Sequence, residues 1–187
     1  MFLTAGGTLA FYTYTTYLQK YLVNTSGFTK PEATQITTLA LFIFMCLQPV
    51  AGALSDRIGR KPLMIFFGIT GVLFTYVLFD ALANTHNYWT AFWLCFGGLV
   101  MVTGYTSINA VVKAELFPAH IRALGVALPY AIANTLFGGT AEFFALSFKE
   151  AGHESWYFIY VSIMIFISLI IYIFMKDTKH HSKIKEH

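Results

Sequence analysis

The chain reads Gly52-Ala-Leu-Ser-Asp-Arg-Ile-Gly-Arg-Lys-Pro62 between two long apolar stretches. The flanking residues 33–54 and 63–79 contain no Asp, Glu, Lys or Arg. A short basic loop between two helices of membrane length is typical of a multi-pass membrane protein and argues against a soluble enzyme. Gly59 permits the tight turn that such a short loop needs.

Charged residues make up 11% of the 187-residue chain, and apolar residues make up 57%. Soluble globular proteins carry about 25% charged residues, so this composition favours a chain surrounded by lipid. A spanning helix takes about 20 residues, which leaves room for six spans. We therefore expect an all-α, polytopic membrane protein whose six transmembrane helices form one bundle over 1–175, with spans at about 2–23, 33–54, 62–81, 89–112, 122–147 and 155–175, followed by a polar, basic tail over 176–187.

Lys and Arg are distributed unevenly between the two sets of predicted loops. One set holds nine of them, namely Arg57, Arg60, Lys61, Lys113, Arg122, Lys176, Lys179, Lys183 and Lys185. The opposite set holds three, namely Lys20, Lys30 and Lys149. The positive-inside rule predicts that the first set, both termini and the basic tail lie in the cytoplasm.

Other chemistries find little support in the sequence. Both cysteines, Cys46 and Cys95, fall inside predicted spans and are expected to behave as small hydrophobic residues. The His180-His181 pair is better explained by a solvated basic tail near anionic lipid than by a metal site. We expect no enzymatic site, cofactor, metal or nucleic-acid partner, and no cleavable signal peptide.

Several motifs together resemble the major facilitator superfamily. The loop pattern Gly52-x-x-x-Asp56-Arg57-x-Gly59-Arg60-Lys61 resembles the signature loop that follows the second helix of each six-helix half in that family. More specific likenesses, to the metabolite:proton symporters and within them to the bacterial α-ketoglutarate permeases, are carried by Gly104-Tyr-Thr-Ser-Ile-Asn-Ala110, Glu115-Leu-Phe-Pro118, Arg122-Ala-Leu-Gly125 and Phe137-Gly-Gly-Thr-Ala-Glu142.

The resemblance covers nearly the whole chain but only the C-terminal half of such a transporter. It implies one half of a major facilitator fold in a bacterial cytoplasmic (inner) membrane, with membrane lipid around it. It also implies an N-terminal six-helix half as partner, with the substrate pathway between the two halves near the bilayer midplane. The implied function is proton-coupled symport of a small dicarboxylate such as α-ketoglutarate by alternating access.

The basic loop has two interpretations. The simpler one is a positive-inside topology signal. The other, implied by the family, is a cytoplasmic latch that docks against the other half, favours the outward-open state and breaks on inward opening. Exposed ion pairs contribute only about 0–1 kcal/mol each, so a latch must act as a network. The residues assigned to this cytoplasmic latch are Gly52, Asp56, Arg57, Gly59, Arg60, Lys61, Glu115 and Arg122.

Polar stripes on three spans supply the candidates for the substrate pathway. Helical spacing places Thr8, Tyr12, Thr15 and Gln19 on one side of the first span, and Tyr105 and Asn109 share a face of the fourth. Tyr130, Asn134 and Glu142 recur along the fifth span, where Pro129 and Gly138-Gly139 are expected to weaken the helix. Such stripes face either a neighbouring helix, through hydrogen bonds, or a water-filled path.

Two charged residues raise separate questions. Glu142 is the one acidic residue well inside a predicted span, and it could be solvated at the outer mouth, paired with a basic residue of the other half, or engaged in proton coupling or gating. Lys113 is expected to extend its side chain to the cytoplasmic interface. On this interpretation the chain offers no cation in mid-membrane to receive a dicarboxylate.

Two alternatives to the symporter half follow from the sequence. The chain could be a truncated, non-transporting bundle, or it could be a half-size transporter that works as a homodimer. The exact substrate, the coupling stoichiometry and the choice among fragment, split half and homodimer are not encoded in any motif of the chain.

Overall fold

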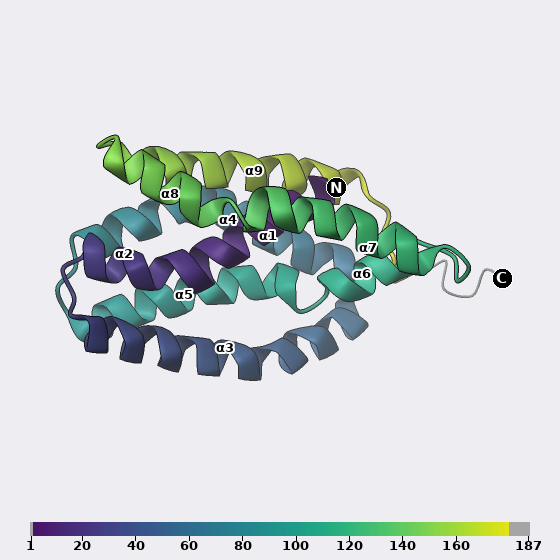
Figure 1. Ribbon diagram of the computed structural model, residues 1–187. Helices are drawn as coiled ribbons and strands as arrows, with labels where there is room; N and C mark the ends of the chain where they lie inside the picture. Colours follow the sequence, from purple (N-terminus) through teal and green to yellow (C-terminus); the bar gives the residue numbers. More distant parts are fainter. Residues whose placement is uncertain (1, 180–187) are drawn as a thin grey trace.

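The computed structural model describes residues 2–179 as a bundle of roughly parallel and antiparallel helices (Figure 1). No β-strand occurs among these residues, so the fold is all-α, as the sequence predicts. The elements are α1 (Phe2–Tyr12), the π-helical turn η1 (Thr13–Tyr17), α2 (Leu18–Asn24), α3 (Lys30–Ile58), α4 (Arg60–Ala83), α5 (Tyr88–Thr106), α6 (Asn109–Glu115), α7 (Arg122–Ala133), the π-helical turn η2 (Asn134–Gly138), α8 (Ala141–Glu150) and α9 (Glu154–Phe174).

Three of the predicted stretches are single helices, and three are runs of shorter segments. Within the described part of the chain, four helical runs are long and apolar enough to cross a membrane, namely Lys30–Ile58, Arg60–Ala83, Tyr88–Glu115 and Glu154–Phe174. The runs α1–η1–α2 and α7–η2–α8 are interrupted by π-helical turns. That these two runs also cross the bilayer stays a prediction, as does the assignment of the basic tail, which lies largely outside the described residues.

Local sequence signals fix several helix ends. Thr29 and Glu32 form a capping box at the start of α3: the Glu32 amide donates to Thr29 Oγ1, and the Thr29 amide donates to Glu32 Oε2. The side-chain oxygen of Asn87 accepts hydrogen bonds from two amides in the first turn of α5. Gly59 separates α3 from α4 with φ of 103°, a conformation that favours glycine.

The helices pack through a buried interior that combines small and aromatic side chains. Where α1 crosses α9, the Gly6 amide donates to Ser168 Oγ at 3.0 Å, an approach that a larger residue at position 6 would prevent. Tyr14 reaches from η1 to α4 and donates to Thr75 Oγ1 at 3.1 Å. Thr13 and Tyr157 share a hydrogen bond of 2.7 Å. These contacts hold η1 against both α4 and α9.

The outer surface of the bundle is strongly apolar. Large hydrophobic side chains are exposed along α3, α4 and α9, among them Phe42, Met45, Val50, Phe66, Leu73, Val77, Ile163, Phe166 and Ile170. Monomeric soluble proteins rarely expose a contiguous apolar surface of this kind. A bilayer would cover it without cost, because lipid chains are as apolar as these side chains.

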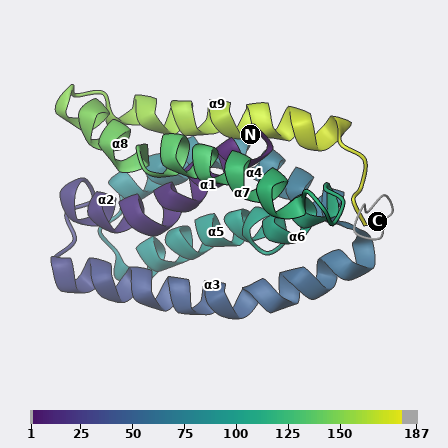
Figure 2. The same ribbon diagram turned by 45° about the vertical axis from the view of Figure 1, so that its right-hand side comes forward.

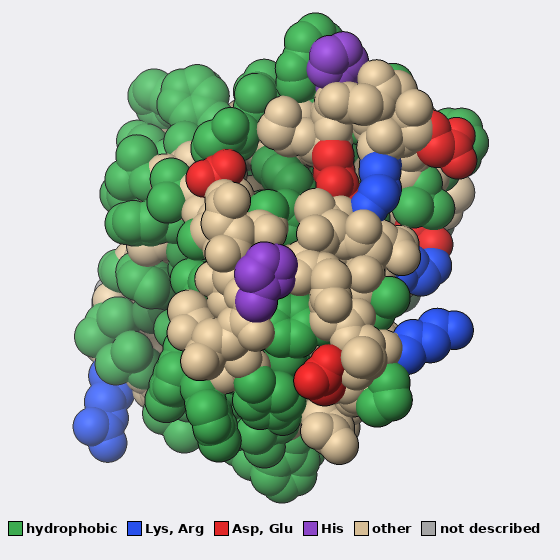
Figure 3. Space-filling model, turned by 90° about the vertical axis from the view of Figure 1, so that its left-hand side faces the viewer, with side chains coloured by type: hydrophobic (Ala, Val, Ile, Leu, Met, Phe, Trp, Pro, Cys, Tyr) green, Lys and Arg blue, Asp and Glu red, His purple; other side chains and the backbone are tan. Residues whose placement is uncertain are grey.

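The connections separate to opposite ends of the bundle. The α3–α4 turn, the α6–α7 connection and the chain after α9 lie at one end, and the α2–α3, α4–α5 and α8–α9 connections lie at the other (Figures 1 and 2). Figure 3 views this second end, where hydrophobic side chains gather along the left and lower edges and polar and charged ones occupy much of the rest. Trp89, Trp93 and Trp156 are all exposed within the first two turns of α5 and α9, near this end.

Candidate functional site

A partly polar cavity of about 230 Å³ opens between three interrupted helical runs. Its wall is formed by residues of α1, the α5–α6 run and the α7–η2 run. Six of the predicted pathway residues line it, namely Thr8, Tyr12, Tyr105, Asn109, Tyr130 and Asn134. Phe11 and Thr106 complete the wall. The structure thus brings together residues far apart in sequence, and their role in transport stays a prediction.

The backbone is irregular at each helix that borders the cavity. The run of α1 passes into η1 directly after Tyr12, and the run of α7 passes into η2 at Asn134. A turn at Ser107–Ile108 separates α5 from α6, between Thr106 and Asn109. Interrupted helices at membrane depth expose backbone groups that are tolerated where they line a cavity. Single π-helical turns also occur frequently at functional sites.

A glycine of η2 packs against two residues of the cavity wall. A Cβ atom at Gly138 would lie 2.5 Å from the ring of Tyr12 and 3.1 Å from Cγ2 of Thr8. The absence of a side chain lets η2 approach α1 closely, and this places Asn134 Nδ2 3.5 Å from the hydroxyl of Tyr12. The phenol of Tyr105 in turn donates to the carbonyl of Thr4 at 3.4 Å.

The other three pathway candidates lie away from the cavity. Thr15 donates to the carbonyl of Phe11 at 2.6 Å, and Gln19 Nε2 donates to Thr34 Oγ1 of α3 at 2.9 Å. Of the polar stripe predicted for the first span, Thr8 and Tyr12 line this cavity and Thr15 and Gln19 do not, and the role of the stripe in a substrate pathway stays a prediction. The π-helical turn η1, over Thr13–Tyr17, lies between Tyr12 and Gln19 and interrupts the regular α-helical spacing on which that stripe was based.

Glu142 has a partner within this chain. Its carboxylate forms an ion pair with the ammonium group of Lys20, and the two side chains are 34% and 46% exposed. Glu142 lies in the first turn of α8, beyond the turn at Gly139–Thr140 that follows η2. The pair links α8 to α2, so Glu142 does not need a cation from another chain to be paired.

Lys113 does not extend to the interface, which corrects the sequence prediction. Lys113 is only 7% exposed, and its Nζ donates to Asn109 Oδ1 at 2.8 Å. The ammonium also lies 4.0 Å from the centre of the Tyr130 ring, a cation–π arrangement. Asn109 precedes Lys113 by one helical turn, and α7 supplies Tyr130 directly opposite, so the side chain is held inside the bundle.

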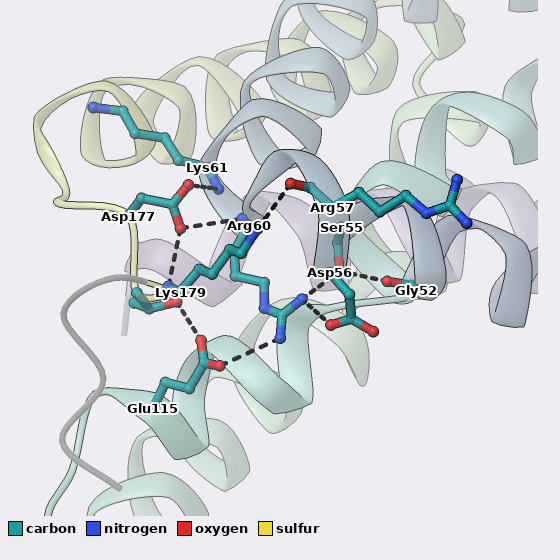
Figure 4. Close-up of polar contacts among 10 residues, drawn as sticks. Gly52, Ser55, Asp56, Arg57, Arg60, Lys61, Glu115, Asp177 and Lys179 are labelled. Carbon is teal, nitrogen blue, oxygen red and sulfur yellow. Dashed lines mark hydrogen bonds and ion pairs between the residues drawn. The ribbon is translucent and has the colours of Figure 1, made fainter. Parts of the chain in front are cut away.

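A charge network forms at the end of the bundle that holds the α3–α4 turn (Figure 4). Its centre is the guanidinium of Arg60, which is 12% exposed. One nitrogen, Nη1, lies 2.5 Å from Asp56 Oδ1 and 2.8 Å from Ser55 Oγ. The other, Nη2, lies 3.4 Å from Oε1 of Glu115, whose side chain is 8% exposed. The network therefore joins α3, α4 and α6.

The chain after α9 closes this network. Asp177 accepts hydrogen bonds from the amides of Arg60 and Lys61, at the open N-terminus of α4, and from the amide of Lys179. Thr178 Oγ1 donates to Glu115 Oε2 at 2.5 Å. Sequence reasoning missed Ser55, Asp177, Thr178 and Lys179. The available signal was Asp177, one of two acidic residues in a tail that has four lysines.

The remaining residues assigned to the cytoplasmic latch make separate contacts. The carbonyl of Gly52 accepts from Ser55 Oγ, and the carbonyl of Arg57 accepts from Lys179 Nζ, while the Arg57 side chain points away (Figure 4). Lys61 Nζ donates to the carbonyl of Ile173 at the end of α9. Arg122 Nε donates to the carbonyl of Phe117 within the α6–α7 connection.

An apolar exterior, a partly polar cavity between interrupted helices and a charge network at one end are features typical of membrane transport proteins. The chain belongs to the major facilitator superfamily, whose family model matches residues 1–187. It is similar to the α-ketoglutarate permease of Escherichia coli, with 50% identity over 168 residues, which are 90% of this chain and 39% of the permease.

Two more distant relatives carry other substrates in their names. The chain is 28% identical over 174 residues to a glycine betaine/proline/ectoine/pipecolic acid transporter of Dickeya dadantii, covering 91% of this chain and 34% of that protein. It is 27% identical over 143 residues to the citrate-proton symporter of Klebsiella pneumoniae, covering 74% of this chain and 31% of that protein. The chain thus spans about two fifths or less of the length of these relatives. No solved structure matches the chain.

Proposed function

We propose that this chain is the C-terminal six-helix half of a proton-coupled transporter for a small dicarboxylate such as α-ketoglutarate. The observation that carries the proposal is the polar cavity bounded by three interrupted helices in a bundle with an apolar exterior. The 50% identity to a permease named for α-ketoglutarate supports the substrate class. The similarity to a citrate-proton symporter supports proton coupling. We propose a bacterial inner membrane as its location, because the bundle has an apolar exterior and both relatives are bacterial.

The weak burial of one helical run supports a second half. In α7, η2 and α8 the buried residues are Ala133, Gly138, Ala141 and Ala145, all of them small. Large side chains of this run, including Leu124, Leu128, Tyr130, Leu136 and Phe143, are exposed. Tyr130 belongs both to this exposed surface and to the cavity wall. We infer that an N-terminal half covers this side and supplies the opposite wall, and that rocking of the halves gives alternating access.

The charge network is the proposed cytoplasmic latch. It already joins three helices and the chain after α9 within this half, with two of its members largely buried. A surface ion pair is worth about 0–1 kcal/mol, whereas a partly buried network contributes more and couples its members. Docking of the other half against Asp56, whose side chain is 67% exposed, would favour one state of the cycle.

The test uses the intact transporter, by which we mean this chain joined to an N-terminal six-helix half. In proteoliposomes with an inward proton gradient, the intact transporter should accumulate radiolabelled α-ketoglutarate, and a protonophore should abolish the accumulation. The chain alone should take up no more than empty vesicles, because it has one wall of the pathway. Gradient-driven uptake by the chain alone would favour the homodimer, and no uptake by either form would favour the non-transporting bundle.

A further inference from the structure

Lys113 is a buried cation for which residues 2–179 supply no carboxylate within ion-pair distance. The nearest acidic residue along the chain, Glu115, is engaged with Arg60 and Thr178. The partners of Lys113 are a neutral amide oxygen and an aromatic ring. Burying a charge without an opposite charge is costly, so such a group normally has a counter-ion that arrives from elsewhere.

Both partners of Lys113 belong to the wall of the cavity. Asn109 and Tyr130 line it, and Nζ lies 2.8 Å from Oδ1 of the first and 4.0 Å from the ring centre of the second. The ammonium is therefore directly behind the wall, on the side of the cavity nearer the α6–α7 connection. A lysine side chain carries its ammonium group on a flexible four-carbon stem, so the group can leave these partners without movement of the helix.

The amide of Asn109 is poorly suited to binding an anion by itself. Its Oδ1 accepts from Lys113, and its Nδ2 donates to the carbonyl of Thr106 at 3.2 Å. The other wall residues supply hydroxyl groups, an amide and aromatic rings, none of which carries a positive charge. Within the described residues, Lys113 is the cation that contacts the cavity wall.

We propose that Lys113 is a substrate-binding residue that forms the ion pair with one carboxylate of the transported anion. The inference rests on the proposed function and deepens it by assigning one charge of a dicarboxylate to this half. As the anion enters, the ammonium leaves Asn109 Oδ1 and the Tyr130 ring and pairs with the carboxylate. Without substrate, the ammonium group is held by the neutral Asn109 amide and the Tyr130 ring. Because these contacts are weak, little free energy is lost when the ammonium leaves them for the carboxylate.

The test compares Lys113→Gln, Lys113→Arg and a matched control, Lys30→Gln, in the intact transporter. Lys30 is exposed in the first turn of α3 and is not among the residues that line the cavity. For Lys113→Gln we expect the Kd for α-ketoglutarate to rise at least about tenfold, the loss of one charge-assisted contact. Lys113→Arg should keep more of the affinity, and Lys30→Gln should leave it unchanged.

Thermal unfolding without substrate separates a binding role from a structural one. Replacing an unpaired buried cation should leave the melting temperature of Lys113→Gln equal to or above that of the parent. If Lys113 merely holds Asn109 and Tyr130 in place, the melting temperature should fall while the Kd stays within about twofold, and that result would overturn the inference.

A panel of carboxylates distinguishes this inference from the proposed function. Stabilisation of the parent by some other carboxylate, with uptake of that compound, would refute α-ketoglutarate as substrate; loss of that stabilisation in Lys113→Gln would still support Lys113. Uptake of α-ketoglutarate that Lys113→Gln leaves intact would refute the role of Lys113 alone. A parent that binds no carboxylate would refute both.

Discussion

The guanidinium of Arg60 holds the charge network together through partners in very different surroundings. Asp56 is 67% exposed, whereas Glu115 is 8% exposed and has a second hydrogen bond from Thr178. Water screens the first pair and is excluded from the second. The shorter ion pair, 2.5 Å against 3.4 Å, is therefore not expected to be the more important one.

We expect Glu115→Gln to reduce the free energy of unfolding by about 1–3 kcal/mol, because it leaves a largely buried guanidinium without its buried counter-charge. Asp56→Asn should cost about 0–1 kcal/mol, as for other exposed pairs. Denaturant unfolding of the intact transporter in detergent measures both values. Equal losses would show that burial does not decide the strength of this network.

Asp56→Asn should instead act on turnover. Asp56 is at the end of α3, away from the cavity, and its exposed carboxylate is available to the other half in the latch hypothesis. A tenfold shift between two states needs about 1.4 kcal/mol. The initial uptake rate should fall while the Kd for α-ketoglutarate is unchanged; a weakened Kd with a normal rate would argue against the latch.

Both the backbone conformation of Gly59 and the space around it disfavour a side chain at this position. Its φ of 103° disfavours any other residue, and a Cβ atom would collide with the carboxylate of Asp177. We expect Gly59→Ala to cost about 1–3 kcal/mol of stability. The matched control is Gly97→Ala in α5, where a Cβ meets nothing within 4 Å and a helical alanine should gain about 0.5–1 kcal/mol. Thermal unfolding measures both variants, and equal changes in their melting temperatures would contradict this account.

Single residues show where prediction from sequence succeeds and fails. Spacing identified Asn109 and Tyr130 as polar positions on helices, and the structure places both at the cavity. Lys113 was misjudged, because a lysine near a predicted helix end normally reaches water, and the aromatic ring opposite it comes from another helix. Asp177 was missed because its role depends on three amides that only the folded chain assembles.

At the scale of the helices, the features around the cavity are departures from regular geometry. The sequence predicted the apolar stretches, since length and hydropathy suffice for that. It did not predict η1 or η2, because a π-helical turn depends on packing that composition does not encode. Pro129 was expected to weaken the fifth span, yet α7 continues through it and the interruption comes at η2 and Gly139–Thr140.

The ion pair between Lys20 and Glu142 connects α2 to α8, and charge reversal tests its importance. Lys20→Glu and Glu142→Lys should each impair uptake, because each puts like charges together. The double exchange should restore much of the activity, since an exposed pair of about 0–1 kcal/mol tolerates reversal. Uptake by the three variants under one proton gradient is the measurement. Failure of the double exchange would mean that Glu142 has a chemical role, such as proton coupling.

At the scale of the whole molecule, the two sets of connections predict the orientation in the membrane. The end with the charge network should face the cytoplasm, because it carries the excess of Lys and Arg. In a variant without Cys46 and Cys95, a cysteine at Asn87 should react with an impermeant reagent from outside, and one at Lys179 should react only after permeabilisation. The reverse pattern would invert the topology.

The positions of the tryptophans have an optical consequence. All three indoles of this chain are exposed near one end, and none lines the cavity. Excited at the indole band, the chain should therefore emit from the lipid–water boundary, with brominated lipids quenching it most when the bromine lies at shallow depth. Filling the cavity should leave this emission almost unchanged. A tryptophan introduced at Phe11, against this constant background, would supply the signal for substrate occupancy that the natural chain lacks.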